Sequence, residues 1–318
     1  MRFRLACRII PRVNVTVTEL TDELIASYAK VGGINHLEGA NLPSKTAIAG
    51  ITCALLRLLF PGFFDDKLIH SSELKIETAN LMDQVLGQLE DEIYKSLEYS
   101  TRGERKKKQL RADAHNLTLG LLSSLPRTRD LLQTDVEAAY SGDPAALSKE
   151  EVIVAYPFIE AIAVQRLAHE LYLNQVALIP RIMTEWAHGR TGLDIHPGAQ
   201  IGTHFFVDHC TGTVIGETCI IGDHVKLYQS VSLIARSLTG GQQLRGKKRH
   251  PTLEDDVTIY AGATIMGGDT VVGSGSTIGA NVFLTHSVAP HSLVIPEDVR
   301  VKVLNKLERQ AGSADFQI

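Results

Sequence analysis

Cysteine is scarce in this sequence. Only four occur in 318 residues, at Cys7, Cys53, Cys210 and Cys219, and no two of them form a CxxC pair. Four cysteines spread over a chain of this length do not make the disulfide framework of a small secreted domain. We therefore expect reduced thiols and a cytoplasmic protein.

Long apolar runs are also missing. The best candidate for a membrane span, residues 47–64, is interrupted by Arg57 and Pro61, so the sequence predicts no helix that crosses a bilayer. The first twelve residues contain four arginines and no acid, but they lack the serine richness of a transit peptide. We expect residues 1–20 to form an exposed extension, in part disordered.

An excess of positive charge is absent as well. The 32 lysines and arginines are outnumbered by 36 acids, which gives a net charge of −4. This balance excludes a protein that holds nucleic acid by bulk electrostatics. The basic run at residues 104–108 is therefore interpreted as a solvated helix end or loop. The hydrophobic fraction of 44% indicates a folded globular protein, and the length suggests about two domains.

The composition changes near Gly192. Ten of the 26 glycines precede this position, although it lies well past the middle of the chain. Before it, apolar side chains recur at helical spacing along residues 81–97, 131–140 and 159–171, and Pro157 suits a first helical turn. The sequence therefore predicts an all-helical domain over residues 1–190.

After Gly192, apolar residues recur every six positions. They form four in-phase groups: Ile195, Ile201 and Val207; Ile215, Ile221, Leu227 and Leu233; Leu253, Ile259 and Ile265; Val272, Ile278 and Leu284. A period of six suits a short strand and a turn, three of which close one triangular coil. The sequence thus predicts about four coils of a parallel β-helix over residues 191–296, followed by a C-terminal tail at 297–318.

Two interruptions of the period mark insertions in the coils. The spacing is eight between Val207 and Ile215, and twenty between Leu233 and Leu253. The longer insertion contains the glycine-rich, basic segment 235–249. Insertions in a solenoid fall on its faces, often where it binds a ligand, so we expect residues 235–249 to form an exposed excursion.

Histidine and acidic residues occur around the first interruption. His209 lies in it, directly after Asp208, and follows Asp194 by fifteen residues, close to one coil of about eighteen. Asp194 can therefore lie near His209 on a neighbouring coil and orient it as a base. A corner histidine bonded to a carbonyl fits the spacing equally well. Arg249, beside His250, could bind a carboxylate in bidentate fashion or be an ordinary surface arginine.

The segments 194–202, 207–212, 214–218 and 249–251 (DIHPGAQIG, VDHCTG, VIGET and RHP) together resemble serine O-acetyltransferases of the hexapeptide-repeat acyltransferase family. The resemblance is densest over residues 130–296. It implies a helical domain followed by a left-handed parallel β-helix, and hence an α+β fold. It also implies transfer of an acetyl group from acetyl-CoA to the hydroxyl of L-serine, giving O-acetyl-L-serine for cysteine biosynthesis.

Carried over to the matching positions, the resemblance implies His209 as general base and Asp194 as its orienting partner. The implied serine site consists of Asp143, Pro144, Asp208, Arg249 and His250. The implied acetyl-CoA contacts are the small residues Ala235, Ala261 and Ala280. An Asp-Pro pair alone is more often a turn, and small residues also suit tight corners. No metal is expected.

Three other interpretations fit some of the residues. The first is a hexapeptide acetyltransferase for a different hydroxyl acceptor. The second is a γ-type carbonic anhydrase, a β-helix trimer with zinc on three histidines, because seven of the twelve histidines lie in residues 196–291. The third is a non-catalytic scaffold. The DIHP and RHP segments have no explanation in a carbonic anhydrase.

The resemblance further implies partners. A homotrimer is expected, because a β-helix buries its cofactor groove only against a neighbour, and many members pair into a dimer of trimers. L-cysteine is expected to inhibit at the serine site, since its thiol replaces a hydroxyl on the same frame. Many members end in isoleucine, whose carboxylate enters O-acetylserine sulfhydrylase; Ile318, with Asp315 upstream, matches that ending. Neither nucleic-acid nor membrane partners are expected.

Overall fold

The computed structural model describes residues 15–65, 68–102, 104–237 and 239–297. The chain separates into two compact units between Asn41 and Leu42. The described part of the first unit contains α1 (Val17–Lys30) and a short 3-10 helix, η1 (Gly32–Ile34). Thr16 and Glu19 form a reciprocal cap at the start of α1. The tail residues 298–318, Ile318 included, lie outside the described residues.

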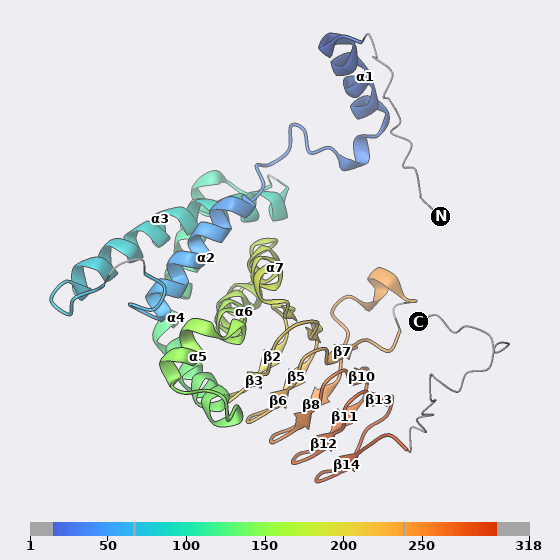
Figure 1. Cartoon of the computed structure of the whole chain (residues 1–318). Coiled ribbons are helices and arrows are strands. Elements are labelled where there is room, and N and C mark those ends of the chain that lie inside the picture. The colour runs from blue at the N-terminus through green and yellow to red at the C-terminus, as the bar shows by residue number, and fades with distance from the viewer. Residues whose placement is uncertain (1–14, 66–67, 103, 238, 298–318) are drawn as a thin grey trace, which may run out of the picture. The chain divides into compact units, whose positions relative to one another are not determined.

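The second unit begins with helices that pack around one apolar core (Figure 1). They are α2 (Lys45–Leu59), α3 (Leu74–Thr101), α4 (Lys107–Gly142), α5 (Lys149–Ala155), α6 (Pro157–Leu173) and α7 (Ile179–Thr191). The predicted apolar stripes fall in α3, α4 and α6, and Pro157 is the first residue of α6, as expected. The basic run at residues 104–108 is exposed at the start of α4. These features confirm the predicted helices, and the domain bounds 1–190 stay a prediction.

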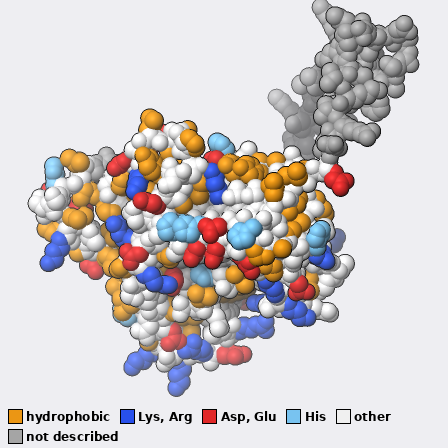
Figure 2. Space-filling model, turned by 90° about the horizontal axis from the view of Figure 1, so that it is seen from below, with side chains coloured by type: hydrophobic (Ala, Val, Ile, Leu, Met, Phe, Trp, Pro, Cys, Tyr) orange, Lys and Arg blue, Asp and Glu red, His pale blue; other side chains and the backbone are white. Residues whose placement is uncertain are grey.

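Across the described ranges, no single helix is long and apolar enough to cross a membrane. Only α5 and α6 taken together, which meet at a bend of 74°, reach that hydropathy. Most of α6 is buried in the core. Lysine and arginine side chains are scattered over the face drawn in Figure 2.

From Asp194 onward the chain winds into short parallel strands. These are β1 (Asp194–Ile195), β2 (Gln200–Ile201), β3 (Phe206–Val207), β4 (Val214–Ile215), β5 (Ile220–Ile221), β6 (Lys226–Leu227), β7 (Ser232–Ile234), β8 (Thr252–Leu253), β9 (Thr258–Ile259), β10 (Thr264–Met266), β11 (Val271–Val272), β12 (Thr277–Ile278), β13 (Phe283–Leu284) and β14 (Leu293–Val294). The period-six anchors fall in these strands, where all but the partly exposed Ile201 are buried. The pattern therefore identified the inward side chains.

The strands form three parallel sheets that close a triangular prism. Sheet A is β1-β4-β7-β10-β13, sheet B is β2-β5-β8-β11, and sheet C is β3-β6-β9-β12-β14. Each coil passes through A, B and C in turn, so the prism has an AB corner, a BC corner and a CA corner. This is the left-handed parallel β-helix that the sequence predicts.

The first interruption is a two-residue insertion at the CA corner. Ser230 N–H donates to the carbonyl of Thr211 (2.9 Å), and Gly262 N–H donates to that of Gln229 (3.1 Å). Thr211 and Gln229 therefore occupy equivalent positions on successive coils. His209 and Cys210 are the extra pair, both with φ near +60°. Cys210 is buried and the His209 side chain is 71% exposed, so the insertion pushes only the histidine outward.

The second interruption is the excursion at residues 235–249. It leaves sheet A after β7, contains a short 3-10 helix, η2 (Gly241–Leu244), and returns to sheet B at β8. Most of its described side chains are exposed, as expected. The excursion therefore belongs to the AB corner.

A buried ion pair joins the helices to the first coil. Asp135 in α4 accepts two hydrogen bonds from the Arg166 guanidinium in α6, at 2.8 and 2.9 Å. Arg166 also donates to the carbonyl of Gly202 (2.8 Å), and Asp135 accepts from the N–H of Phe205 (3.1 Å). Since both side chains are fully bonded, the pair fixes α4 and α6 against the BC corner.

Candidate active site

The CA corner brings together Asp143, Asp208 and His209. Asp143 follows α4 and accepts a hydrogen bond from the Tyr156 hydroxyl (2.5 Å) and another from the N–H of Ala145 (2.9 Å). These two bonds hold the pKa of Asp143 below its ordinary value. The same bond to Asp143 raises the pKa of Tyr156 to about 12. His209 Nε2 lies 3.6 Å from a carboxylate oxygen of Asp208.

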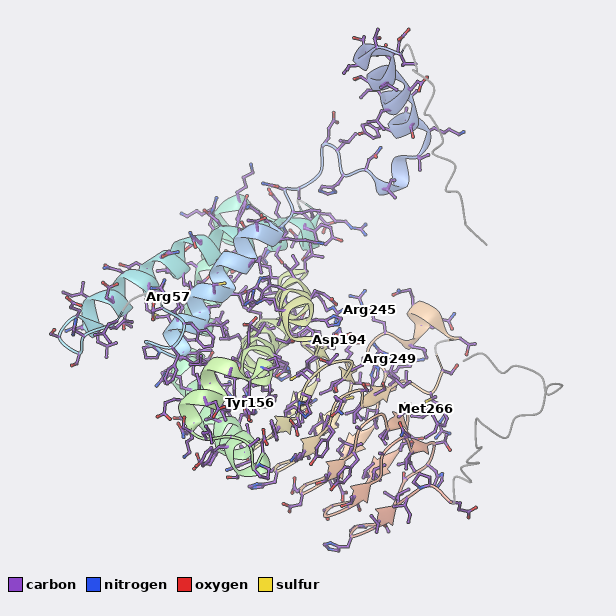
Figure 3. All side chains as sticks on the ribbon, in the orientation of Figure 1. Arg57, Tyr156, Asp194, Arg245, Arg249 and Met266 are labelled. Carbon is purple, nitrogen blue, oxygen red and sulfur yellow. The ribbon has the colours of Figure 1, made fainter. Side chains whose placement is uncertain are left out.

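Two side chains that the sequence analysis did not single out support this corner. Tyr156 stands between α5 and α6 (Figure 3). Lys226, in β6, donates from Nζ to the carbonyl of Gly142 (2.5 Å), the last residue of α4. Its positive charge also contributes to the low pKa of Asp143. Tyr156 therefore fixes Asp143 within the helical part of the chain, and Lys226 connects that part to the His209 corner.

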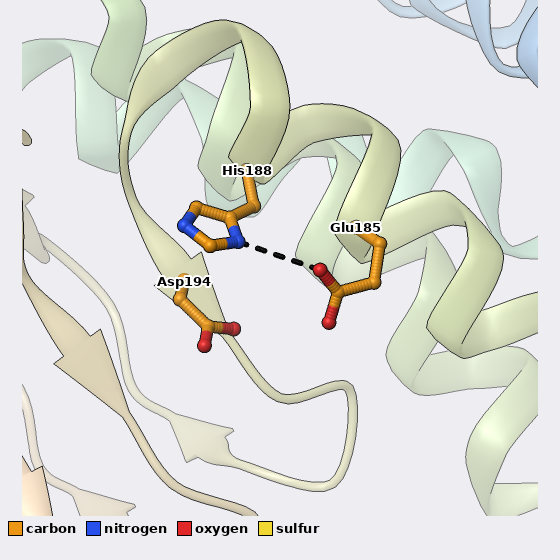
Figure 4. Close-up of side chains that lie close together, drawn as sticks. All are labelled: Glu185, His188 and Asp194. Atoms are coloured by element: carbon orange, nitrogen blue, oxygen red, sulfur yellow. Dashed lines mark hydrogen bonds and ion pairs between the residues drawn. The ribbon is translucent and has the colours of Figure 1, made fainter.

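Asp194 opens β1 at the same corner, one coil before His209. Its N–H donates to the carbonyl of Thr213 (3.0 Å). Its carboxylate lies beside His188 and Glu185 of α7 (Figure 4), with the ligand atoms of all three within 4.8 Å of one another. In the described part of the chain, no hydrogen bond links Asp194 to His209. The fold thus brings the expected dyad to one edge but not into contact.

Metal binding can be judged from the same group. The Glu185, His188 and Asp194 side chains are close enough to share an ion, and His188 Nδ1 lies 3.4 Å from Glu185 Oε2. Among the described residues this is the one group of three potential ligands at such distances. It contains a single histidine, whereas the carbonic anhydrase interpretation requires three. Within the described residues of a single chain, the geometry therefore gives that interpretation no zinc site.

Arg249 and His250 lie at the AB corner. Arg249 forms an ion pair with Glu217, which also accepts a hydrogen bond from the Tyr172 hydroxyl (2.8 Å). The Thr218 hydroxyl accepts from the backbone N–H groups of Arg249 (2.9 Å) and His250 (3.0 Å). The GET and RHP segments are thus one hydrogen-bonded unit, which the sequence analysis quoted separately.

His250 is held as a neutral imidazole. The residue is buried, and its Nδ1 accepts a hydrogen bond from the N–H of Thr218 (3.1 Å). Burial, reinforced by the charge of Arg249, lowers the pKa of His250 to about 4. Because Nδ1 is an acceptor, the ring hydrogen is on Nε2. His250 can therefore donate a hydrogen bond to a ligand at neutral pH.

One chain does not unite the two corners. His209 lies at one edge of sheet A and Arg249 at the other. The sheet spans about four residues between these edges, which is roughly 13 Å at ~3.3 Å per residue. The expected acetyl-CoA residues divide in the same way. Ala261 and Ala280 follow β9 and β12 at the CA corner, whereas Ala235 follows β7 at the AB corner. Pro144 is exposed in the turn after Asp143.

Comparison with known proteins decides the family. No family model matches the chain. A plasmid serine acetyltransferase of Synechococcus elongatus is 45% identical over 271 residues, which cover 81% of this chain and 83% of the relative. The chain belongs to the serine acetyltransferase family. The serine acetyltransferase of Bacillus licheniformis is 43% identical over 188 residues, 58% of this chain and 84% of the relative.

Solved serine acetyltransferases share the architecture. Isoform 3 from Entamoeba histolytica, in complex with cysteine, has a TM-score of 0.69 at 30% identity and covers 91% of this chain and 95% of its own. Serine acetyltransferase 1 of the same organism, in complex with L-cysteine, has a TM-score of 0.67 at 33% identity and covers 87% of this chain and 100% of its own. The protein is therefore an acyltransferase of cysteine biosynthesis that acetylates L-serine from acetyl-CoA, as the motif series predicts.

Proposed function

We propose that the active site forms between two copies of this chain in a homotrimer, where the CA corner of one faces the AB corner of the next. The observation that supports this is the division of the expected serine-binding residues between two edges of sheet A. His209 is largely exposed in the single chain, although a general base needs a site that excludes water. A neighbour's Arg249 and His250 would cover it.

In this site, serine binds through both of its charged groups. Its ammonium lies between Asp143 and Asp208, and the low pKa of Asp143 keeps that carboxylate ionised. Its carboxylate takes a bidentate hydrogen bond from Arg249 of the adjacent copy, with the Nε2–H of His250 as a further donor. Pro144 holds the turn that presents Asp143. The serine hydroxyl is then directed at His209.

Proton transfer through His209 drives the reaction. Neutral His209 takes the hydroxyl proton as the serine oxygen forms a bond to the thioester carbonyl carbon. The tetrahedral intermediate collapses by breaking the carbon–sulfur bond, and the imidazolium returns its proton to the CoA thiolate. In this proposal the Asp194 carboxylate turns from His188 and Glu185 toward His209, where it orients the ring and stabilises the imidazolium. The products are O-acetyl-L-serine and CoA.

Acetyl-CoA lies along the CA corner beneath His209. Ala261 and Ala280 form the small-residue side of its path, and Ala235 of the adjacent copy lies on the opposite side. L-cysteine competes with serine, because the same ammonium and carboxylate contacts accept either amino acid.

Three further expectations from the sequence stay predictions: a cytoplasmic location, the pairing of two trimers, and activity without a metal ion.

His209→Asn tests this assignment with little effect on the fold. Asparagine tolerates the left-handed backbone conformation that His209 adopts, and the side chain is exposed. We expect kcat for serine acetylation to fall about 10²–10⁴-fold, with an unchanged melting temperature. His291→Asn is the matched control, since His291 has the same backbone conformation and is also exposed.

The choice of acceptor is measured in the same assay. Thioester consumption with L-serine is compared with that for other hydroxyl compounds such as L-homoserine, and L-cysteine is added as competitor. Serine is expected to be the preferred acceptor. Near wild-type turnover by His209→Asn would remove His209 from the mechanism, and failure of cysteine to compete would remove the proposed inhibition.

A further inference from the structure

Gln229 lies at the CA corner, one coil from the insertion that holds His209. Backbone hydrogen bonds run from Ser230 to Thr211 (2.9 Å), from Gly262 to Gln229 (3.1 Å) and from Asn281 to Ala261 (3.0 Å). They place Thr211, Gln229 and Ala261 at equivalent positions on consecutive coils, and Ala280 follows on the next. We call these four residues the corner column. Gln229 is its one amide side chain, between His209 and the two alanines.

The side-chain oxygen of Gln229 is buried and unpaired. Oε1 is shielded from solvent and accepts no hydrogen bond from any residue that the structure describes. Within that part of the chain it is the one buried side-chain nitrogen or oxygen atom in this condition. Buried acceptors are ordinarily satisfied, because leaving them unpaired is costly. Gln229 as a whole is only partly buried, and no hydrogen bond from a described residue holds its amide in place. Its side chain can therefore turn the oxygen outward to a donor that the single chain does not supply.

A flat aromatic wall borders the same place. Tyr228, directly before Gln229, stacks on Tyr260 with ring centroids 4.9 Å apart and planes 8° from parallel. These rings directly follow β6 and β9, two strands of sheet C on successive coils. A ligand that runs along the corner column thus meets an apolar side, small residues, and then one amide group just before His209.

The arm of acetyl-CoA has a donor with matching spacing. Adjacent coils are separated by the usual interstrand distance of ~4.8 Å. In the cofactor, two methylene carbons separate the last amide nitrogen from the thioester sulfur, which is roughly 4 Å at ordinary bond lengths. An amide N–H at the level of Gln229 therefore places the thioester at the level of His209.

We propose that Gln229 binds acetyl-CoA by accepting, through Oε1, the N–H of the amide nearest the thioester. This inference rests on the proposed function, in which His209 is the base and Ala261 and Ala280 line the path of the arm. The hydrogen bond from Gln229 fixes how far the thioester travels along the corner. It thereby aligns the thioester carbonyl carbon with the serine hydroxyl.

Gln229→Met tests the contact, because methionine keeps the length of the side chain and removes the acceptor. Three acetyl donors are compared with serine as acceptor: acetyl-CoA, N-acetyl-S-acetylcysteamine, which keeps only the amide next to the thioester, and S-ethyl thioacetate, which lacks that amide. We expect kcat/KM to fall about tenfold for the first two donors and to stay unchanged for the third, with an unchanged KM for serine.

Two further variants complete the experiment. Gln229→Glu keeps an acceptor oxygen and should remain within about threefold of the wild type on all three donors. Gln229→Ala matches the next residues of the corner column, so it provides the same selective loss if the methionine variant does not fold. Gln200→Met, on the exposed start of β2 in sheet B, is the control and should leave all three donors unaffected.

The outcomes separate this inference from the proposed function. Equal losses on all three donors would overturn the assigned amide contact. Unchanged acetyl-CoA kinetics would also overturn it, most directly if size-exclusion chromatography showed a weakened oligomer, because the oxygen would then serve a contact between subunits. Failure of the wild-type protein to acetylate serine would count against the proposed function and not against Gln229 alone.

Discussion

Gly216 lies directly against the imidazole of His250. A methyl group built on Gly216 would come within 2.0 Å of His250 Cδ2 and 2.2 Å of Nε2. A methyl group on Gly267 would meet the backbone of Arg249 and His250 at 2.1 and 2.4 Å. Two glycines thus form the space that holds this histidine.

Gly216→Ala is therefore expected to displace His250 and weaken serine binding. Because a shift of about 1 Å can cost up to ~10²-fold in catalysis, we expect kcat/KM for serine to fall about 10–100-fold. Steady-state kinetics measures this. Gly87→Ala in α3, where nothing lies within 4 Å of the new methyl group, should leave kinetics unchanged. Equal kinetics in both variants would show that the position of His250 is unimportant.

Removal of the Tyr156 hydroxyl should affect serine binding through Asp143. In Tyr156→Phe, Asp143 loses the bond that contributes most to its low pKa. Its pKa then rises, so the carboxylate becomes protonated at a higher pH than in the wild type. We expect KM for serine to rise about fivefold at neutral pH. As the pH is lowered, the further increase in KM should begin at a higher pH in the variant than in the wild type. Superimposable profiles of KM against pH would contradict this role.

Stability should fall in acid because His250 is held neutral. Its pKa is about 4 in the folded protein and near 6.5 in an unfolded chain. The unfolded state therefore binds more protons between these values, and the free energy of unfolding decreases as the pH drops from about 6.5 to 4. Urea unfolding at several pH values measures the slope, and His250→Asn should make it shallower.

The buried pair of Asp135 and Arg166 should tolerate joint replacement better than the loss of one partner. Arg166→Met leaves the Asp135 carboxylate buried without its counter-ion, which costs about 3–5 kcal/mol. Adding Asp135→Leu removes the uncompensated charge, so part of the stability should return. Denaturant midpoints of the wild type, both single variants and the double variant complete the cycle. A double variant less stable than either single one would contradict this account.

The β-helix could be predicted from the sequence because its signal is local. Each inward anchor, such as Ile215 or Ile259, repeats within a single turn of strand and corner. The corner that holds Arg249 could not be predicted in the same way, because a twenty-residue gap interrupts the phase. Lys226 gave no signal either, since its bond to Gly142 joins residues 84 positions apart. Contacts of that range depend on how helices dock on coils.

The oxygen of Gln229 was invisible to sequence analysis for a related reason. A glutamine at a corner is unremarkable by composition, and only its burial without a partner distinguishes it. The separation of the expected site residues is similar: the motifs identified Asp143, His209 and Arg249 together, but a motif has no information about how far apart the fold places them.

The two-residue insertion at His209 and Cys210 leaves the hydrogen-bond ladder of the coils intact around it. The ladder closes on both sides of it, with Asp208 N–H donating to Leu227 (2.9 Å) and Ser230 N–H donating to Thr211 (2.9 Å). Removing His209 and Cys210 would return this corner to the length of the CA corners on the following coils. A hexapeptide scaffold could thus gain or lose the proposed base by the insertion or deletion of two codons, because these interstrand hydrogen bonds do not involve the inserted pair.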